Sequence, residues 1–269
     1  MIDALSSARN ACMMSQEFDS RAGSGAQFHT TRWTLVLASA ESQSAEGKAA
    51  LAELCGLYWY PLYAFARRRG RAPHDAQDLT QGFLMHLLEH RGLTRVDPLK
   101  GKFRSFLLGS FQNYLANELQ RSRSLKRGGK NEIISLDWQD AESRYQLEPA
   151  DYLTAEKIYD ARWAMTLLRQ VMTQLRDRYV AQGKGPIYEA LQGYLRFGDE
   201  SRMPPYEEVA KGMGIGVPAL KTLIHRMRKQ YTAILREEVG RTVSDSSEID
   251  AEIHSLCDAL IAAEGRIGE

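Results

Sequence analysis

Apolar residues recur at three- and four-residue intervals along most of the chain, and alternating strand-like patterns are scarce. This spacing is typical of amphipathic α-helices, so the sequence predicts an all-α protein. Breakers such as Gly70, Pro73 and Gly101 separate the periodic stretches. The expected helices cover residues 30–40, 47–69, 74–91, 102–124, 154–181, 187–197, 206–213 and 217–238, and one more begins near residue 246.

The length of 269 residues favours two helical domains over one, because typical domains hold about 100–150 residues. We place the boundary where the helical pattern lapses, around the segment GGKNE. The predicted organisation is a disordered leader at 1–27, a first helical domain at 28–127, a linker at 128–153, a second helical domain at 154–243 and an acidic C-terminal helix or tail at 244–269.

Charge is segregated along the chain although 35 basic and 34 acidic residues nearly cancel. Residues 100–130 carry eight Lys or Arg against the single Glu118, and residues 219–236 carry five against no acid. Residues 237–269 reverse this balance with nine acids against two arginines. Two basic segments of this kind are candidates for binding nucleic acid, which overall net charge would not reveal.

The cysteines and the hydropathy pattern indicate the cellular compartment of the protein. Cys12, Cys55 and Cys257 are isolated, which suits neither a disulfide framework nor a cysteine-rich metal site and indicates a reducing cytoplasm. The longest stretches without a charged residue, such as Leu54–Ala66, hold about 13 residues. A bilayer crossing needs roughly 20, so we expect no membrane partner and a cytoplasmic protein.

The stretch PPYEEVAKGMGIGVPALKTLIHRMRKQYTAILREEV predicts a helix-turn-helix, with Gly214 relieving the tight turn. Its second helix has a buried stripe and an opposite polar face. A recognition helix places base-reading side chains near its N-terminal half and phosphate-binding cations farther along. The alternative is a solvated cationic face, which the preceding helix and glycine disfavour. The candidate DNA contacts are Lys221, Thr222, His225, Arg226, Arg228 and Lys229.

The basic helix at 102–124 differs in kind, because its cations share the helix with exposed amides and several aromatic residues. Such a surface suits single-stranded or melting DNA, whose unstacked bases can stack on rings and hydrogen-bond to amides. A purely core role is the alternative for the aromatic residues. The candidate contacts are Arg104, Asn113, Asn117 and Arg121, with Phe103 open between core and contact.

The stretch DAQDLTQGFLMHLLEH supports two interpretations. His86, Glu89 and His90 have the H-x-x-E-H spacing of one class of zinc peptidases. The preceding residues instead alternate polar and apolar positions, as on an amphipathic helix with a docking surface. A peptidase site needs a third ligand, and no recognisable downstream motif supplies one, so docking is favoured over metal binding.

Several of these pieces occur together and in order: FHTTRWTLVLAS, WYPLYAFARRRG, DAQDLTQGF, DPLKGKFRSFLLGSFQNYLANELQRSRSLKRGG and YEEVAKGMGIGVPALKTLIHRMRKQY. Taken together, they resemble a bacterial RNA polymerase sigma factor of the extracytoplasmic-function (ECF) type, in a subgroup with a long linker and a C-terminal extension. The resemblance covers most of residues 28–240. It implies a region-two-like bundle and a region-four-like helix-turn-helix domain, joined by the linker.

The resemblance implies a non-catalytic factor, without cofactor or metal, that gives core RNA polymerase its promoter specificity. The 74–91 helix would dock on the clamp helices of the β′ subunit, the 102–124 helix would open and read the minus-ten element, and the 217–238 helix would read the minus-thirty-five element. The implied partners are core RNA polymerase, promoter DNA and, as is typical of the wider family, an anti-sigma factor. The implied docking residues are Asp75, Asp78, Gln81 and Phe83.

Departures from the family pattern bear on two of these roles. Gly82 stands where an acidic residue is usual, and Phe106 and Asn117 replace a usual tryptophan and aspartate. Two other functions stay open: a stand-alone helix-turn-helix regulator of transcription and, more remotely, a zinc hydrolase that uses HLLEH. The acidic tail either packs on the second domain or covers the basic recognition helix and inhibits the chain.

Overall fold

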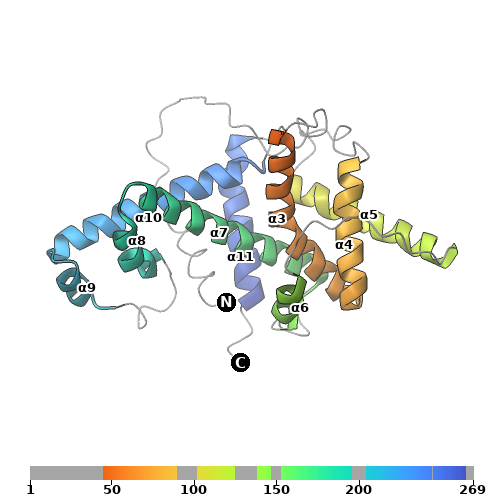
Figure 1. Ribbon diagram of the computed structural model, residues 1–269, viewed down its shortest axis with the longest axis horizontal. Helices are drawn as coiled ribbons and strands as arrows, with labels where there is room; N and C mark the ends of the chain where they lie inside the picture. Colours follow the sequence, from red (N-terminus) through yellow and green to blue (C-terminus); the bar gives the residue numbers. More distant parts are fainter. Residues whose placement is uncertain are drawn as a thin grey trace. The chain divides into compact units, whose positions relative to one another are not determined.

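The computed structural model describes residues 45–89, 102–124, 138–146, 153–195, 204–243 and 245–264 (Figure 1). Every regular element in these ranges is a helix, which confirms the all-α prediction. Within them, no helix combines the length and apolar character that a membrane crossing requires. The predicted leader at 1–27 and the predicted helix at 30–40 lie outside the described residues.

The chain divides into two compact units. The first unit contains the described residues up to Trp163 together with residues 241–243, and the second unit contains the remainder. The helices of the first unit are α3 (Ala45–Arg68), α4 (Pro73–Glu89), α5 (Phe103–Ser124), α6 (Trp138–Gln146) and the first part of α7 (Ala155–Ala181).

A glycine turn joins α3 to α4, which pack against each other (Figure 1). Gly70 has φ +80°, a left-handed conformation that costs glycine little, and the amide of Arg71 donates to the carbonyl of Ala66 at 3.2 Å. Pro73 then opens α4, where the missing amide of proline costs nothing because a first-turn amide has no partner within the helix. The turn therefore follows directly from the local sequence.

Aromatic side chains from four helices form the core of the first unit. Tyr58 of α3 contacts Phe103 of α5 edge-on, with ring centroids 5.5 Å apart, and stacks on Trp163 of α7 at 6.1 Å. Phe111 of α5 lies 6.0 Å from Phe65 of α3 and 5.0 Å from Phe83 of α4. Aromatic pairs of this kind add about 0.5–1.5 kcal/mol each beyond the burial of their area.

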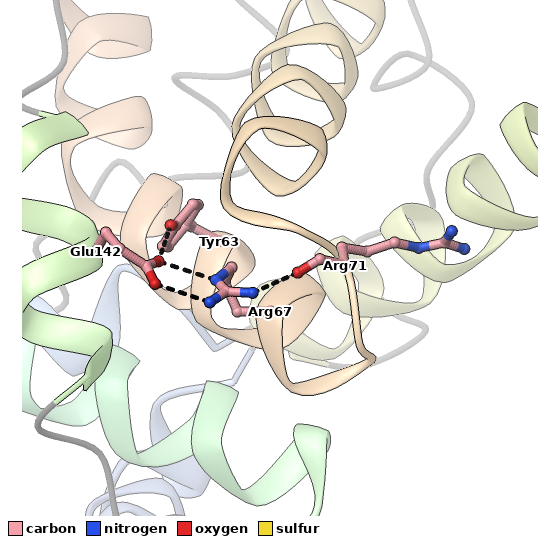
Figure 2. Close-up of polar contacts among 4 residues, drawn as sticks. All are labelled: Tyr63, Arg67, Arg71 and Glu142. Carbon is pink, nitrogen blue, oxygen red and sulfur yellow. Dashed lines mark hydrogen bonds and ion pairs between the residues drawn. The ribbon is translucent and has the colours of Figure 1, made fainter.

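Helix α6 occupies part of the predicted linker and is anchored to α3 (Figure 2). Arg67 donates from Nε and Nη2 to the two carboxylate oxygens of Glu142 at 2.9 and 2.8 Å, and Tyr63 donates to the same carboxylate at 2.5 Å. The third donor of Arg67, Nη1, bonds the carbonyl of Arg71 at 2.5 Å. One arginine thus ties α6 to the end of α3, a connection that composition did not indicate.

The second unit contains the rest of α7 and three short helical elements before its longest helix, α10. Its further elements are α8 (Gly185–Leu191), η2 (Gln192–Leu195), α9 (Tyr206–Gly212), α10 (Val217–Gly240), η4 (Ser246–Glu248) and α11 (Ile249–Glu264). Helices α9 and α10 flank a turn in which Gly214 has φ +67° and the amide of Ile215 donates to the carbonyl of Ala210 at 3.0 Å. The structure thus has a tight glycine turn between two helices at the position that the sequence predicted.

Helix α11 packs against α10 and α7 through an apolar face. Ile253, Leu256 and Leu260 are buried, and together with Ala164 and Leu235 they line a small apolar pocket. Asp250 forms a bidentate ion pair with Arg236 of α10. Of the two alternatives for the acidic tail, packing on the second unit therefore agrees with the structure.

The division between the two units falls inside α7, between Trp163 and Ala164, whereas the sequence placed it in the predicted linker. The first turns of α7 belong to the first unit because Tyr159 and Trp163 are fully buried there. The hydroxyl of Tyr159 donates to the carbonyl of Arg104 at 3.1 Å. These contacts join residues far apart in the sequence, so the periodicity of α7 could not place the division.

Candidate nucleic-acid interface

The first half of α10 presents a cationic surface. Its buried stripe includes Leu220, Ile224 and Met227, so the side chains between them face away from the core. Five of the six candidate DNA contacts are exposed: Lys221, Thr222, His225, Arg226 and Lys229. The hydroxyl of Thr222 donates to the carbonyl of Pro218 at 3.0 Å, within its own helix. The exposed cations suit contacts with a duplex.

Arg228 departs from the sequence-based expectation of a DNA contact. Its side chain is half-buried, and Nε and Nη2 donate to the carbonyl of Tyr194 at 3.3 and 3.0 Å. Burial lowers the pKa of its guanidinium, because a charge removed from water is disfavoured. Arg228 therefore holds η2 against α10, and the proposed DNA contacts on this helix exclude it.

Tyr206, the first residue of α9, was missed by sequence reasoning. The residue is 36% exposed, and its ring lies parallel to the ring of buried Tyr194, with centroids 5.2 Å apart and an interplanar angle of 7°. The ammonium of Lys221 lies 5.4 Å from the centroid of the Tyr206 ring. The available signal was an aromatic residue at the start of α9. The sequence could not show that Tyr194 and Lys221 would contact it, because they belong to separate elements.

The second candidate surface lies on the first unit, around α5. Asn113 and Asn117 are exposed and line a cleft of about 260 Å³. The cleft is also lined by Phe106, Ser110, Tyr114 and Glu118 of α5 and by Phe83, His86 and Leu87 of α4. Amides, a hydroxyl and aromatic rings thus surround one hollow, a combination that suits an unstacked base.

Phe103 and Arg104 depart from the expectation that they contact DNA. Phe103 is fully buried against Tyr58. Arg104 is 6% exposed, forms an ion pair with Asp160 of α7 and lies 5.5 Å from the centroid of the Trp163 ring. Both side chains therefore belong to the core of the first unit, and we correct their assignment. Arg121 also lies on α5, but its side chain is outside the described part of the structure.

Helix α4 carries the candidate docking residues, and in the structure some of them are exposed and others are buried. Asp75 and Asp78 are exposed, and Gln81 is half-buried. Phe83 is 1% exposed, between Phe111 at 5.0 Å and Tyr114 at 5.7 Å, so its ring is a core element and its assignment to a docking surface is corrected. The remaining surface is acidic and lies near the start of the helix.

Gly82 has a packing role that explains its presence at mid-helix. A Cβ atom added there would lie 2.5 Å from the hydroxyl oxygen of Tyr114. Such a separation is too short for a carbon–oxygen contact, so the absence of a side chain at Gly82 lets Tyr114 approach α4. Tyr114 also lines the cleft, and the glycine thereby shapes the cleft wall.

The metal-site alternative rests on His86, Glu89 and His90, and only the side chain of His86 is described by the structure. Among the described side chains, no group of three or more His, Cys, Asp or Glu is arranged to hold a metal ion. His86 is exposed, and its ring lies 5.6 Å from that of Tyr114 at the cleft. His90 lies outside the described residues.

Comparison with known proteins concerns the first unit, which carries α4 and the cleft of α5. Residues 60–124 match the model of sigma-70 region 2, a segment that includes most of the first unit's described core. The match makes this segment similar to region 2 of sigma-70 factors, and the likeness covers residues 60–124 of the 269-residue chain. None of the curated proteins and none of the solved structures compared with the chain matches it.

Proposed function

We propose that the chain is a sigma factor of the ECF type, which binds core RNA polymerase and directs promoter recognition, DNA opening and initiation. The observation that carries the proposal is the match over residues 60–124, because this segment holds both the acidic start of α4 and the cleft of α5. RNA synthesis belongs to the polymerase, and the chain contributes binding energy alone. Its place of work is then the bacterial cytoplasm.

Docking on the β′ clamp helices is assigned to the exposed side of α4. Asp75 and Asp78 are three residues apart and therefore neighbours on one helix face. Gln81 extends this row by a further three residues and is half-buried. Two carboxylates in water favour a partner with cationic groups, and they act over a Debye length of about 8 Å at physiological salt.

Promoter opening is assigned to the cleft of α5. Asn113 and Asn117 lie one turn apart at its exposed edge, and the rings of Phe106 and Tyr114 line it. An amide side chain offers both donors and an acceptor to a base edge, and a ring offers a stacking surface of about 1–3 kcal/mol per base. The cleft therefore suits a strand whose bases have left the duplex.

The minus-thirty-five element is assigned to α10, through Lys221, Thr222, His225, Arg226 and Lys229. All five are exposed on the face opposite the buried stripe. Good bidentate base contacts contribute about 1–3 kcal/mol of discrimination each, and phosphate contacts weaken as salt rises. Promoter specificity would thus combine contacts of α10 with duplex DNA and contacts of the α5 cleft with single-stranded DNA.

Co-purification with core RNA polymerase tests the proposal. The double variant Asp75→Arg, Asp78→Arg inverts the docking charges and should lose at least about tenfold in affinity, since like charges at an interface cost several kcal/mol. The matched control is Asp177→Arg, Asp258→Arg, which inverts two exposed acids of the second unit. Retention by the control with loss in the docking variant supports the proposal.

The opposite outcome points to the alternative function. If neither the unaltered chain nor the variants retain polymerase, while the unaltered chain still binds duplex DNA, the chain acts as a stand-alone helix-turn-helix regulator. A palindromic target and a stable dimer would accompany that result, because such regulators match their own twofold symmetry to the operator.

A further inference from the structure

Two cations of α10 contact a pair of stacked tyrosines that precede it in the chain: one lies over a ring, and the other bonds a backbone carbonyl. Tyr206 and Tyr194 lie parallel, with centroids 5.2 Å apart. Lys221 is placed over the Tyr206 ring, and Arg228 holds the Tyr194 carbonyl with two hydrogen bonds. Lys221 and Arg228 are seven residues apart, or about two helical turns, so they lie along the same side of α10.

The inner ring of this stack is fixed in place. Tyr194 is 1% exposed, and its hydroxyl donates to the carbonyl of Pro204 at 2.9 Å. Its own carbonyl accepts from Nε and Nη2 of Arg228 at 3.3 and 3.0 Å. The outer ring, Tyr206, thus lies against a rigid platform, and its exposed face is turned to the start of the recognition helix.

We propose that Tyr206 is a positioning residue for Lys221 in the duplex-reading surface. This inference rests on the assignment of α10 to duplex DNA. A lysine side chain has four rotatable bonds, and immobilising such a chain on binding is unfavourable. The Tyr206 ring confines the ammonium before DNA arrives, because the negative face of an aromatic ring attracts a cation.

The geometry leaves the ammonium able to bind DNA. The ring occupies one side of the Lys221 ammonium at 5.4 Å from the centroid, and Lys221 is otherwise exposed. An ammonium has three N–H donors, so those directed away from the ring can reach a phosphate or a base edge. Lys221 would therefore enter the complex already oriented, and Tyr206 would contribute without itself contacting DNA.

A double-mutant cycle on the full chain tests this role. The probe is a duplex that the unaltered chain selects from a randomised pool, and the variants are Tyr206→Leu, Lys221→Gln, their combination and Tyr206→Phe. We expect Tyr206→Leu to weaken binding by about 3- to 10-fold, in line with the ordering of one long side chain. Tyr206→Phe keeps the ring and should retain affinity. Tyr206→Leu should cause no further loss in the Lys221→Gln background.

Two further measurements separate positioning from a structural role. Lys221→Gln should lower the slope of log affinity against log salt by about one, and Tyr206→Leu should lower it in the same direction. Far-UV circular dichroism and thermal unfolding verify that each variant is folded. An equal loss from Tyr206→Leu with and without Lys221 would overturn the inference, as would unchanged affinity in Tyr206→Leu or in Lys221→Gln. Failure of the unaltered chain to select any duplex would instead refute the proposed duplex-reading function.

Discussion

The anchor between α6 and α3 depends on one carboxylate, and the change Glu142→Gln removes its charge while keeping its shape. Glu142 accepts two hydrogen bonds from Arg67 at 2.8 and 2.9 Å and one from Tyr63 at 2.5 Å. A neutral amide can accept at its oxygen alone, and its NH₂ group would face the guanidinium donors of Arg67. The bidentate pair is therefore lost, and Arg67 keeps its bond to the Arg71 carbonyl.

The expected cost of Glu142→Gln follows from how exposed the Arg67–Glu142 ion pair is. Fully exposed ion pairs contribute about 0–1 kcal/mol, whereas hydrogen bonds to charged groups contribute about 1.5–3 kcal/mol. The side chains of Arg67 and Glu142 are 18% and 24% exposed, closer to the buried case. We therefore expect Glu142→Gln to cost about 1–2 kcal/mol in the docking of α6.

Hydrogen exchange over residues 138–146 measures this cost locally. A helix of nine residues is not stable alone in water, so undocking of α6 should expose its amides to exchange. A loss of about 1–2 kcal/mol corresponds to exchange roughly 5- to 30-fold faster. The matched control is Glu156→Gln, because Glu156 pairs with Arg69 at 3.8 Å and both side chains are about half exposed. Unchanged exchange in Glu142→Gln, or an equal change in the control, would refute the reasoning.

The same anchor predicts a pH dependence. Hydrogen bonds from Arg67 outweigh partial burial and hold the pKa of Glu142 below its ordinary value. A carboxyl whose pKa is lower in the folded state stabilises that state fully above its unfolded pKa, and the effect is lost as pH falls through the folded pKa. The difference in exchange between the unaltered chain and Glu142→Gln should thus be constant above about pH 5 and shrink below it.

Two further predictions concern the cleft of the first unit. Gly82→Ala should not give the gain of about 1 kcal/mol expected from helix propensity, because the new Cβ would meet the Tyr114 hydroxyl at 2.5 Å. Adding Tyr114→Phe should recover that gain in thermal unfolding, and a full gain from Gly82→Ala alone would contradict the packing. Asn113→Ala with Asn117→Ala should weaken binding to a promoter duplex with an unpaired minus-ten segment by about tenfold, while a fully paired duplex binds as before. Equal losses on both probes would argue against a single-strand reader.

The local sequence was sufficient to predict most of the described helices and the glycine turns between them. Helical periodicity and backbone breakers act within a few residues, so the bounds of α5 and α7 and the turns at Gly70 and Gly214 could be expected from neighbouring positions alone. The exposed face of α10 was also predictable except at Arg228, because its buried stripe is long and regular. Cations opposite such a stripe have no route to the core.

Tertiary structure decided which residues at the edges of an apolar stripe are covered. Phe103 and Arg104 border the stripe of α5. Tyr58 of α3 covers Phe103, and α7 covers Arg104 by supplying Trp163 and Asp160 from more than fifty residues away. Phe83 is covered in the same way by two rings of α5. A single helix cannot show how wide its covered face is, because that width depends on how many neighbours pack against it.

The same reason accounts for the features that sequence reasoning missed. Helix α6 is short and polar, and its place on α3 depends on Glu142 meeting Arg67 across 75 positions. The Tyr206–Lys221 contact and the close approach of Tyr114 to Gly82 likewise join separate helices. Helical periodicity, helix caps and turns are local properties, because they depend on residues close together in the sequence. Ion pairs, ring stacks and close approaches between helices exist only after the chain has folded, because they depend on distances that local spacing does not set.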